Sequence, residues 1–372
     1  MSTKRLRRVG LPKHIIERFT KLNICTCKDV LSKSFTELLK LTASGSFTVH
    51  EVIQKCSIAC VPSSVTALSL WKDRQEKKSA FLMTSLPELD RVLHGGLLAG
   101  TITEIAGPAG SGKTQFCVML SVLATLPRML GGLEGSVLYI DTEGAFSAER
   151  LLEIARSKYC EHFKDESTLK SLAENVYVDV QQTCSSLLKR LQCLEQDIIS
   201  KRIKLVIIDS IASLVRKEFS TTLGQNLANR TNFLSQEAAI LKYTAEVFSI
   251  PIVVTNQITT RFGPQNRGTA GQCETSEQSL AGDGSYVTVA LGNTWSHSVN
   301  TRLILQYLDG EKRQVMVAKS PISPFTAFIY TIQDQGIVED EGGAQHYKGT
   351  DPGIQHIQVR SALPICMSQC DT

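Results

Sequence analysis

The sequence lacks any long hydrophobic run. No stretch of eighteen or more apolar residues occurs among its 372 residues, and a transmembrane helix needs about that length, so we expect no membrane contact. The first residues are basic and no apolar stretch follows them, so a secretory signal is not expected either. A hydrophobic content of 42% with 20% charged residues is instead typical of a soluble globular protein.

Cysteine pairs at metal-binding spacing are also missing. The chain has eleven scattered cysteines and no C-x-x-C pair, whereas structural zinc sites usually combine two such pairs. Disulfide frameworks belong to secreted proteins with even numbers of cysteines. We therefore expect reduced thiols in the cytosol or nucleus, and no cysteine-bound metal.

The chain has little excess charge of either sign. Its formal net charge is +4, which by itself does not indicate nucleic-acid binding. Basic residues are concentrated in residues 1–21, where seven lysines and arginines accompany one acid, Glu17. Such a cluster contacts phosphates, serves as a localisation signal, or is a solvated charged end, and the sequence leaves these open.

Four segments differ in their residue pattern. Residues 1–60 have helical periodicity without strand signals, which predicts a small all-α domain. Residues 61–80 are polar and are predicted to be a linker. Residues 81–340 alternate short β-branched runs with helical stretches, which predicts an α/β core with a mostly parallel sheet. Residues 341–372 lose all periodicity and are predicted to form a loose tail.

Short apolar segments are the candidate strands of this core. Those expected to be parallel are residues 101–105, 137–140, 176–180, 205–208 and 252–255. Their almost wholly apolar composition suits strands that are covered on both faces. Near the end, two further candidates flank Asp309-Gly310, a strong hairpin signal. We therefore expect the sheet to finish in a C-terminal antiparallel ribbon.

One motif in the α/β region is highly specific. Eight consecutive residues match G-x-x-x-x-G-K-[ST] in full, namely Gly107, Pro108, Ala109, Gly110, Ser111, Gly112, Lys113 and Thr114. They follow a predicted strand and open an apolar helix, which is the context that the motif requires. Backbone N–H groups of such a loop surround the β-phosphate at the positive end of a helix. The motif predicts an ATP site in which Lys113 neutralises phosphate oxygens and Thr114 ligates Mg²⁺.

Carboxylates follow two of the predicted parallel strands. Asp209 ends the strand at 205–208, and beside a P-loop it is expected to hold a Mg²⁺-bound water. Glu143 lies just past the strand at 137–140 and is predicted to activate the attacking water. Asp141 is the alternate base. The other interpretation of Glu143 is a loop carboxylate that caps the following helix.

Two amides, Asn256 and Gln257, end the strand at 252–255. An amide in this place can sense the γ-phosphate and pass the signal to the segment that follows. Asn and Gln also simply close strands, so the pattern alone is weak.

In order and spacing, these elements resemble the ATPase core of the RecA-type recombinases. Other residues resemble the eukaryotic branch of that family, and these are Leu86 to Asp90 with Gly95-Gly96, Asp141 to Gly144, Glu149-Arg150, Thr255 to Gln257, His297, Thr301-Arg302 and Ser320-Pro321. The N-terminal helical segment resembles the small DNA-associated domain that these proteins carry. The similarity is greatest to a recombinase paralogue of the B type.

The resemblance implies a RecA-like P-loop fold and a role for the chain in homologous recombination and DNA double-strand break repair in the nucleus. It implies a DNA-stimulated ATPase subunit in a hetero-oligomer with other recombinase paralogues, acting on single-stranded or branched DNA. The alternative is an ATP-gated scaffold that assembles with its partners and scarcely turns ATP over.

Site residues follow from the same resemblance. Catalysis is assigned to Glu143, Lys113 and Gln257, and metal binding to Thr114 and Asp209. The P-loop residues bind the nucleotide together with Arg150, which matches a position near the adenine. Gln257 and His297 relay the nucleotide state to the DNA-facing loop between them.

The chain departs from the family at two interface positions. Where the family inserts a Phe into the next subunit, Ser63 to Ala67 contain no aromatic residue. Losing such an anchor costs about 2–4 kcal/mol, so hetero-association is expected in place of a self-filament. Lys319 occupies a position that is usually acidic in the family, in the segment that covers the nucleotide. It supplies a cation across the subunit boundary or remains an ordinary surface lysine.

Two loops are expected to face DNA, at about residues 219–230 and 258–295. The first keeps Arg230 and is otherwise mostly neutral, whereas the second carries Arg261 and Arg267 against three acids. A net negative loop attracts a polyanion weakly. Three aromatic side chains are predicted to stack on bases, namely Phe262, Tyr286 and Trp295.

Overall fold

The computed structural model describes residues 4–42, 45–61, 64–76, 81–219, 224–262, 285–308, 310–340 and 345–346. The chain divides into two compact units, residues 1–76 and 77–372. Helix α5 (Ala67–Glu76) lies in the segment predicted to be a linker. The predicted boundaries at residues 60, 80 and 340 stay predictions.

The first unit is helical, which confirms the expected all-α N-terminal domain. A short 3-10 turn (Leu6–Arg8) precedes α1 (Lys13–Lys21), α2 (Cys27–Leu31), α3 (Phe35–Thr42) and α4 (Ser46–Cys60). Helix α2 begins with a capping box, in which the Thr26 hydroxyl accepts from the Asp29 N–H at 3.2 Å and the Asp29 carboxylate accepts from the Thr26 N–H at 2.9 Å. Aliphatic side chains and the wholly buried Phe19 fill the core of this unit.

The second unit is built on an 11-stranded sheet whose main path runs β12-β11-β10-β9-β3-β7-β6-β4-β5. The parallel strands are β3 (Ile102–Gly107), β4 (Ser136–Asp141), β5 (Val176–Val180), β6 (Ile203–Asp209), β7 (Ile252–Phe262) and β9 (Thr301–Tyr307). Antiparallel strands follow β9, namely β10 (Arg313–Lys319), β11 (Thr326–Gln333) and β12 (Gly336–Glu339). Both the parallel core and the antiparallel ribbon are confirmed.

The remaining strands are short. β1 (Phe81–Leu82) and β2 (Leu97–Leu98) form a separate two-stranded sheet ahead of β3. β8 (Ser285–Val289) pairs with the end of β7, and β13 (Gln345–His346) pairs with β11.

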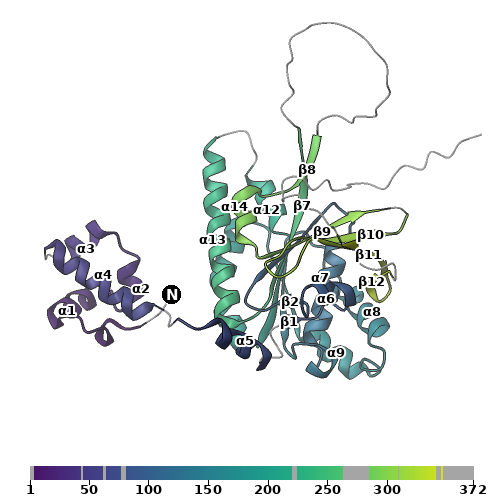
Figure 1. Cartoon of the computed structure of the whole chain (residues 1–372), viewed down its shortest axis with the longest axis horizontal. Coiled ribbons are helices and arrows are strands. Elements are labelled where there is room, and N and C mark those ends of the chain that lie inside the picture. Colours follow the sequence, from purple (N-terminus) through teal and green to yellow (C-terminus); the bar gives the residue numbers. More distant parts are fainter. Residues whose placement is uncertain are drawn as a thin grey trace, which may run out of the picture. The chain divides into compact units, whose positions relative to one another are not determined.

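Helices cover both faces of the sheet (Figure 1). One face packs against α6 (Pro87–Val92), α7 (Lys113–Thr125), α8 (Ala148–Lys158) and α9 (Glu166–Glu174). The other packs against α10 (Cys184–Gln192), α11 (Leu194–Ser200), α12 (Ile211–Glu218), α13 (Gly224–Phe248) and α14 (Gly292–Ser298). Along β4, Val137 and Tyr139 join the first core while Leu138 and Ile140 join the second, so every position of the strand is buried.

Parallel pairing brings the polar strand ends to one edge of the sheet. In the strand register Asp141 lies opposite Asp209, and Gly107 lies opposite Gln257. The P-loop begins where β3 ends. The carboxyl edge of the sheet therefore collects the predicted phosphate, metal and relay residues, as is usual for ligand sites in open α/β sheets.

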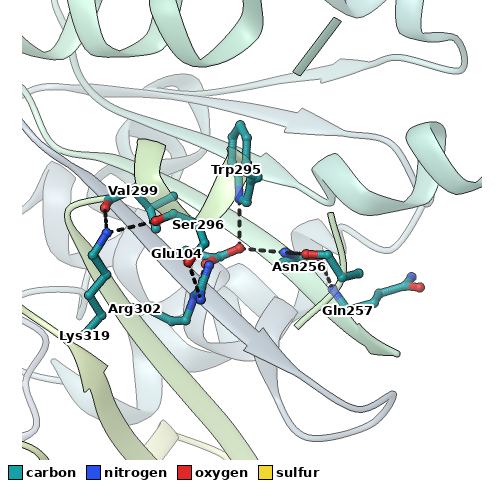
Figure 2. A network of polar contacts seen from close by, with 9 residues as sticks. Glu104, Asn256, Gln257, Trp295, Ser296, Val299, Arg302 and Lys319 are labelled. Atoms are coloured by element: carbon teal, nitrogen blue, oxygen red, sulfur yellow. Dashed lines mark hydrogen bonds and ion pairs between the residues drawn. The ribbon is translucent and has the colours of Figure 1, made fainter. Parts of the chain in front are cut away.

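A buried ion pair lies beneath this edge. Glu104 of β3 is 0% exposed and Arg302 of β9 is 1% exposed. The Glu104 carboxylate accepts hydrogen bonds from Arg302 Nε, from Asn256 Nδ2 at 2.6 Å and from Trp295 Nε1 at 2.9 Å (Figure 2). Each oxygen of the buried charge thus has a donor, which a carboxylate away from water requires.

The same network overturns one prediction for DNA binding. Trp295 is 0% exposed in α14, and its indole N–H is committed to Glu104. A side chain packed in this way presents no face to a base, so the prediction that Trp295 stacks on DNA was wrong. The prediction placed Trp295 in a loop facing DNA, whereas this residue lies on the inner face of a helix.

Lys319 is held by its own chain. Its Nζ donates to the carbonyl oxygens of Ser296 at 2.8 Å and Val299 at 2.6 Å, at the C-terminal end of α14 (Figure 2). A cation is favourable there because the last carbonyls of a helix lack partners within it. Burial lowers the pKa of Lys319, and the Arg302 guanidinium lowers it further. A role for Lys319 across a subunit boundary stays a prediction.

We predict that Glu104→Gln destabilises the second unit strongly. The variant leaves the buried Arg302 charge uncompensated and turns an amide N–H₂ toward at least one of the other donors, so we expect a loss of about 3–5 kcal/mol in the free energy of unfolding. The matched control is Glu161→Gln, because Glu161 is 82% exposed and pairs with Lys164 on the surface. Such surface pairs contribute about 0–1 kcal/mol. Urea denaturation followed by circular dichroism measures both variants, and equal losses would contradict the prediction.

Candidate functional site

The P-loop has the backbone conformation that its glycines allow. Gly110 and Gly112 have φ values of +73° and +99°, in the left-handed region that side chains with a Cβ rarely adopt. A Cβ on Gly110 would lie 2.4 Å from Tyr307 Oη, and one on Gly112 would lie 2.8 Å from Ile332 Cδ1. Both positions therefore favour glycine for the backbone conformation, and at Gly110 the Tyr307 hydroxyl also occupies the space that a Cβ would take.

Lys113 points back along its own loop. Its Nζ donates to the carbonyl oxygens of Gly107 at 3.0 Å and Pro108 at 2.8 Å. Burial lowers the pKa of Lys113, and the Asp209 and Glu143 carboxylates act in the opposite direction. The ammonium thus shares one site with both predicted carboxylates. Phosphate oxygens are stronger acceptors than the loop carbonyls, so the side chain fits the phosphate-binding role.

The Asp209 carboxylate accepts hydrogen bonds from three hydroxyl groups. It is 2% exposed, and its Oδ2 accepts from the hydroxyls of Thr114 and Tyr139, each at 2.7 Å. Its Oδ1 accepts from the Thr255 hydroxyl at 2.5 Å. Mg²⁺ prefers oxygen ligands and keeps several waters. A threonine hydroxyl beside a carboxylate at the start of α7 fits that ion, with Thr114 as direct ligand and Asp209 behind it.

The structure separates the roles of Asp141 and Glu143. Asp141 Oδ1 accepts from the N–H groups of Glu143 at 3.0 Å and Gly144 at 2.8 Å, and its Oδ2 accepts from the Phe146 N–H at 3.0 Å. Asp141 is buried and fixes the loop after β4. Because the group is buried and both of its oxygens are already held by backbone N–H groups, the geometry disfavours Asp141 as the alternate base.

Glu143 is exposed at the strand edge. Its Oε1 accepts from Ser210 Oγ at 2.6 Å and from Gln257 Nε2 at 3.0 Å. The interpretation of Glu143 as the cap of α8 is wrong, because Ser147 occupies the N-cap and accepts from the Arg150 N–H at 3.1 Å. Glu143 is therefore an oriented, accessible carboxylate within electrostatic range of Lys113.

Gln257 connects Glu143 to a residue that the sequence did not single out. The Gln257 side-chain oxygen accepts from Arg216 Nη1 at 2.7 Å while its amide group donates to Glu143. Arg216 lies in the last turn of α12, just before the first predicted DNA loop. A line of hydrogen bonds thus runs from Glu143 to the start of that loop.

Arg150 and His297 lie apart from this line. Arg150 on α8 donates to Gln115 Oε1 at 2.8 Å and, through its other nitrogens, to the carbonyl oxygens of Gln333 and Asp334. It therefore joins the P-loop helix to the turn between β11 and β12, and its contact with adenine stays a prediction. His297 is exposed on α14, and its relay role also stays a prediction.

Two tyrosine hydroxyls that sequence analysis missed bind the P-loop itself. Tyr307 Oη donates to the Ala109 carbonyl at 2.8 Å, and Tyr330 Oη donates to the Ser111 carbonyl at 2.6 Å. These tyrosines lie about two hundred residues after the loop in sequence. No local pattern marks them, because the contact exists only once the antiparallel ribbon has folded beside β3.

The predicted DNA loops are shorter than expected. Helix α13 begins at Gly224, so residues 224–230 are helical, and residues 220–223 lie outside the described part of the chain. The two ends of the second segment are strands. β7 continues to Phe262 and pairs antiparallel with β8 (Figure 1). Residues 263–284, with Arg267, lie outside the described residues, as do the side chains of Arg261, Phe262 and Tyr286.

No helix in the described ranges is both long enough and apolar enough to span a bilayer.

Comparisons with known proteins give matches along most of the chain. Residues 75–340 match the Rad51 family, and residues 6–60 match the XRCC3/RpoA-like helix-hairpin-helix domain. The chain is 50% identical over 346 residues to the DNA repair protein RAD51 homolog 2 of Homo sapiens, covering 92% of this chain and 90% of that protein.

Two more distant relatives extend the similarity to plants and archaea. The RAD51 homolog 2 of Arabidopsis thaliana is 33% identical over 365 residues, covering 97% of this chain and 96% of that protein. The DNA repair and recombination protein RadA of Metallosphaera sedula is 30% identical over 335 residues, covering 89% of this chain and 94% of that protein.

Proposed function

The chain belongs to the Rad51 family, and from this premise we propose that it is a DNA-stimulated ATPase subunit of a nuclear complex of recombinase paralogues. The predicted B type of paralogue is confirmed by its similarity to the RAD51 homolog 2 proteins. Its role is in DNA repair and recombination, as the names of its relatives state for them. ATP hydrolysis by this chain, its DNA substrates and its partners are the parts that we propose.

The bond between Gln257 and Glu143 carries the proposal. At 3.0 Å, Gln257 Nε2 orients the carboxylate that we assign as general base. Gln257 lies on β7, the strand that continues into the second DNA segment, and it also accepts from Arg216 beside the first. DNA that binds either segment therefore fixes Gln257 and, through it, the base, and DNA stimulation is the expected result.

The other residues bind and position the nucleotide. In this proposal the P-loop N–H groups and Lys113 bind the phosphates, and Thr114 with Asp209 would hold Mg²⁺, which supplies charge neutralisation for the phosphates when bound. Glu143 takes the proton of the attacking water. The proposed general base, Glu143, is thus separate from the groups that bind the nucleotide.

We predict that Glu143→Gln abolishes hydrolysis while ATP binding is retained. Gln cannot accept the proton, and a positioned base contributes about 10²- to 10⁴-fold in rate, so phosphate release with single-stranded DNA should fall by that factor. Calorimetric titration with Mg²⁺ and ATP should give an affinity near that of the wild type. The matched control is Glu149→Gln, because Glu149 is exposed on α8 and bonds Ser147 Oγ at 2.8 Å. Unchanged turnover in Glu143→Gln removes Glu143 from its role.

We predict that Gln257→Ala uncouples hydrolysis from DNA. The substitution removes both hydrogen bonds that link Glu143 to Arg216, so the ratio of DNA-stimulated to basal turnover should fall toward one. Phosphate release is measured across a titration of single-stranded DNA, with the exposed Gln192→Ala on α10 as control. Stimulation equal to that of the wild type would show that the signal does not pass through Gln257.

The absence of an aromatic anchor at residues 63–67 supports association with other paralogues over a self-filament. The resemblance to the family implies that ATP lies between neighbouring subunits, and we therefore predict that Lys113→Ala loses both nucleotide and partner. Hydrogen bonds to charged groups contribute about 1.5–3 kcal/mol each, so nucleotide affinity should fall at least about tenfold. The mass of the complex purified from cells measures partner loss, with the exposed Lys189→Ala as control.

Phosphate release by the wild type, measured together with partner loss in Lys113→Ala, separates the proposed ATPase from the ATP-gated scaffold. If the wild type releases no phosphate with or without DNA, and Lys113→Ala still loses its partners, the chain acts as an ATP-gated scaffold. Intact complexes from Lys113→Ala would contradict nucleotide-dependent assembly in either case.

A further inference from the structure

Strands β9, β10 and β11 pair antiparallel with one another and form the C-terminal ribbon, whose side chains hold the P-loop. Tyr307, the last residue of β9, and Tyr330, in β11, donate their hydroxyl protons to the carbonyl oxygens of Ala109 and Ser111. Tyr330 is 1% exposed. Burial raises the pKa of Tyr330, so its hydroxyl keeps the proton that it donates.

One arginine lies between the two tyrosines. Arg313 of β10 is the cross-strand partner of Tyr307 on one side and of Tyr330 on the other, so the three side chains share one face of the ribbon. The Arg313 guanidinium carbon lies 5.5 Å from the centre of the Tyr307 ring, within cation–π range. The Arg313 guanidinium thus packs against the ring of Tyr307.

The two carbonyls belong to the peptide groups that carry the N–H of Gly110 and Gly112. A peptide group is planar and trans, so its C=O and N–H point in opposite directions. A hydroxyl that fixes the Ala109 carbonyl therefore also fixes the Gly110 N–H, and one that fixes the Ser111 carbonyl fixes the Gly112 N–H. In a P-loop such N–H groups are the ones that bind phosphate.

We propose that Tyr307 and Tyr330 are positioning residues for phosphate, which hold the Gly110 and Gly112 N–H groups ready for the nucleotide. The inference rests on the proposed nucleotide site and adds the C-terminal ribbon to it. Groups oriented before binding lose less freedom when the ligand arrives, and this raises affinity. The tyrosines themselves need not touch the nucleotide.

Removing each hydroxyl alone tests this role. In the full-length chain, Tyr307→Phe and Tyr330→Phe keep the rings and should each weaken ADP binding about three- to tenfold, the effect of one hydrogen bond. Calorimetric titration with ADP and Mg²⁺ measures the dissociation constants. The matched control is Tyr177→Phe on β5, whose ring lies under Lys201 Nζ at 4.8 Å. Dissociation constants within twofold of the wild type for both loop variants would overturn the proposal.

A second test uses the position of the Tyr307 hydroxyl. A Cβ at Gly110 would lie 2.4 Å from Tyr307 Oη but 3.7 Å from the ring carbon Cζ, so only the hydroxyl collides with it. Gly110→Ala should weaken ADP binding, and adding Tyr307→Phe should restore part of the loss although it weakens binding on its own. A double variant that is weaker than Gly110→Ala alone contradicts this placement of the hydroxyl.

The inference can also be separated from the proposed function without nucleotide. The backbone amide nitrogen resonances of Gly110 and Gly112 in the free protein should shift in the Phe variant of the matching tyrosine, because the carbonyl of the same peptide group loses its hydrogen bond. If the wild type takes up no ADP, the proposed function fails and these resonances alone decide the inference. Unchanged resonances in both variants would then overturn it.

Discussion

The buried Asp209 carboxylate holds the candidate site together. It accepts from hydroxyls on α7, β4 and β7 while it ends β6 itself, so one charge ties the P-loop helix to three adjacent strands. A buried charge is tolerated only when such donors replace water. Because Tyr139 and Thr255 lie on parallel strands and Thr114 lies on the P-loop helix, the carboxylate also fixes the position of that helix relative to the sheet edge that carries the loop of Glu143.

The ribbon completes the support from the other side of β3. Its first strand, β9, is anchored at one end by the Glu104–Arg302 pair and ends at the other in Tyr307, which binds the P-loop. The buried pair and the tyrosine contact are thus joined by a single strand. A P-loop held between Asp209 and the ribbon needs little rearrangement to accept phosphate, and this arrangement makes β9 to β11 part of the binding machinery.

The sequence predicted those parts of the site that local patterns encode. The P-loop is contiguous, and Asp209 and Glu143 follow apolar strands, so parallel pairing alone brings them together. Arg216, Tyr307 and Tyr330 were not predicted, because their contacts span separations of 41, 198 and 219 residues and depend on how the elements pack. Trp295 was predicted wrongly for a related reason, since only the packing of α14 on the sheet decides which way its indole faces.

The carboxylates at the sheet edge differ in role because they differ in burial. Asp141 and Asp209 are buried and accept on both oxygens, so they shape the site and hold its charges. Glu143 is exposed, and within the described residues its two side-chain contacts both fall on Oε1. One oxygen is therefore held in place while the other can face a water. A base needs both properties, orientation and a free lone pair, and Glu143 combines them.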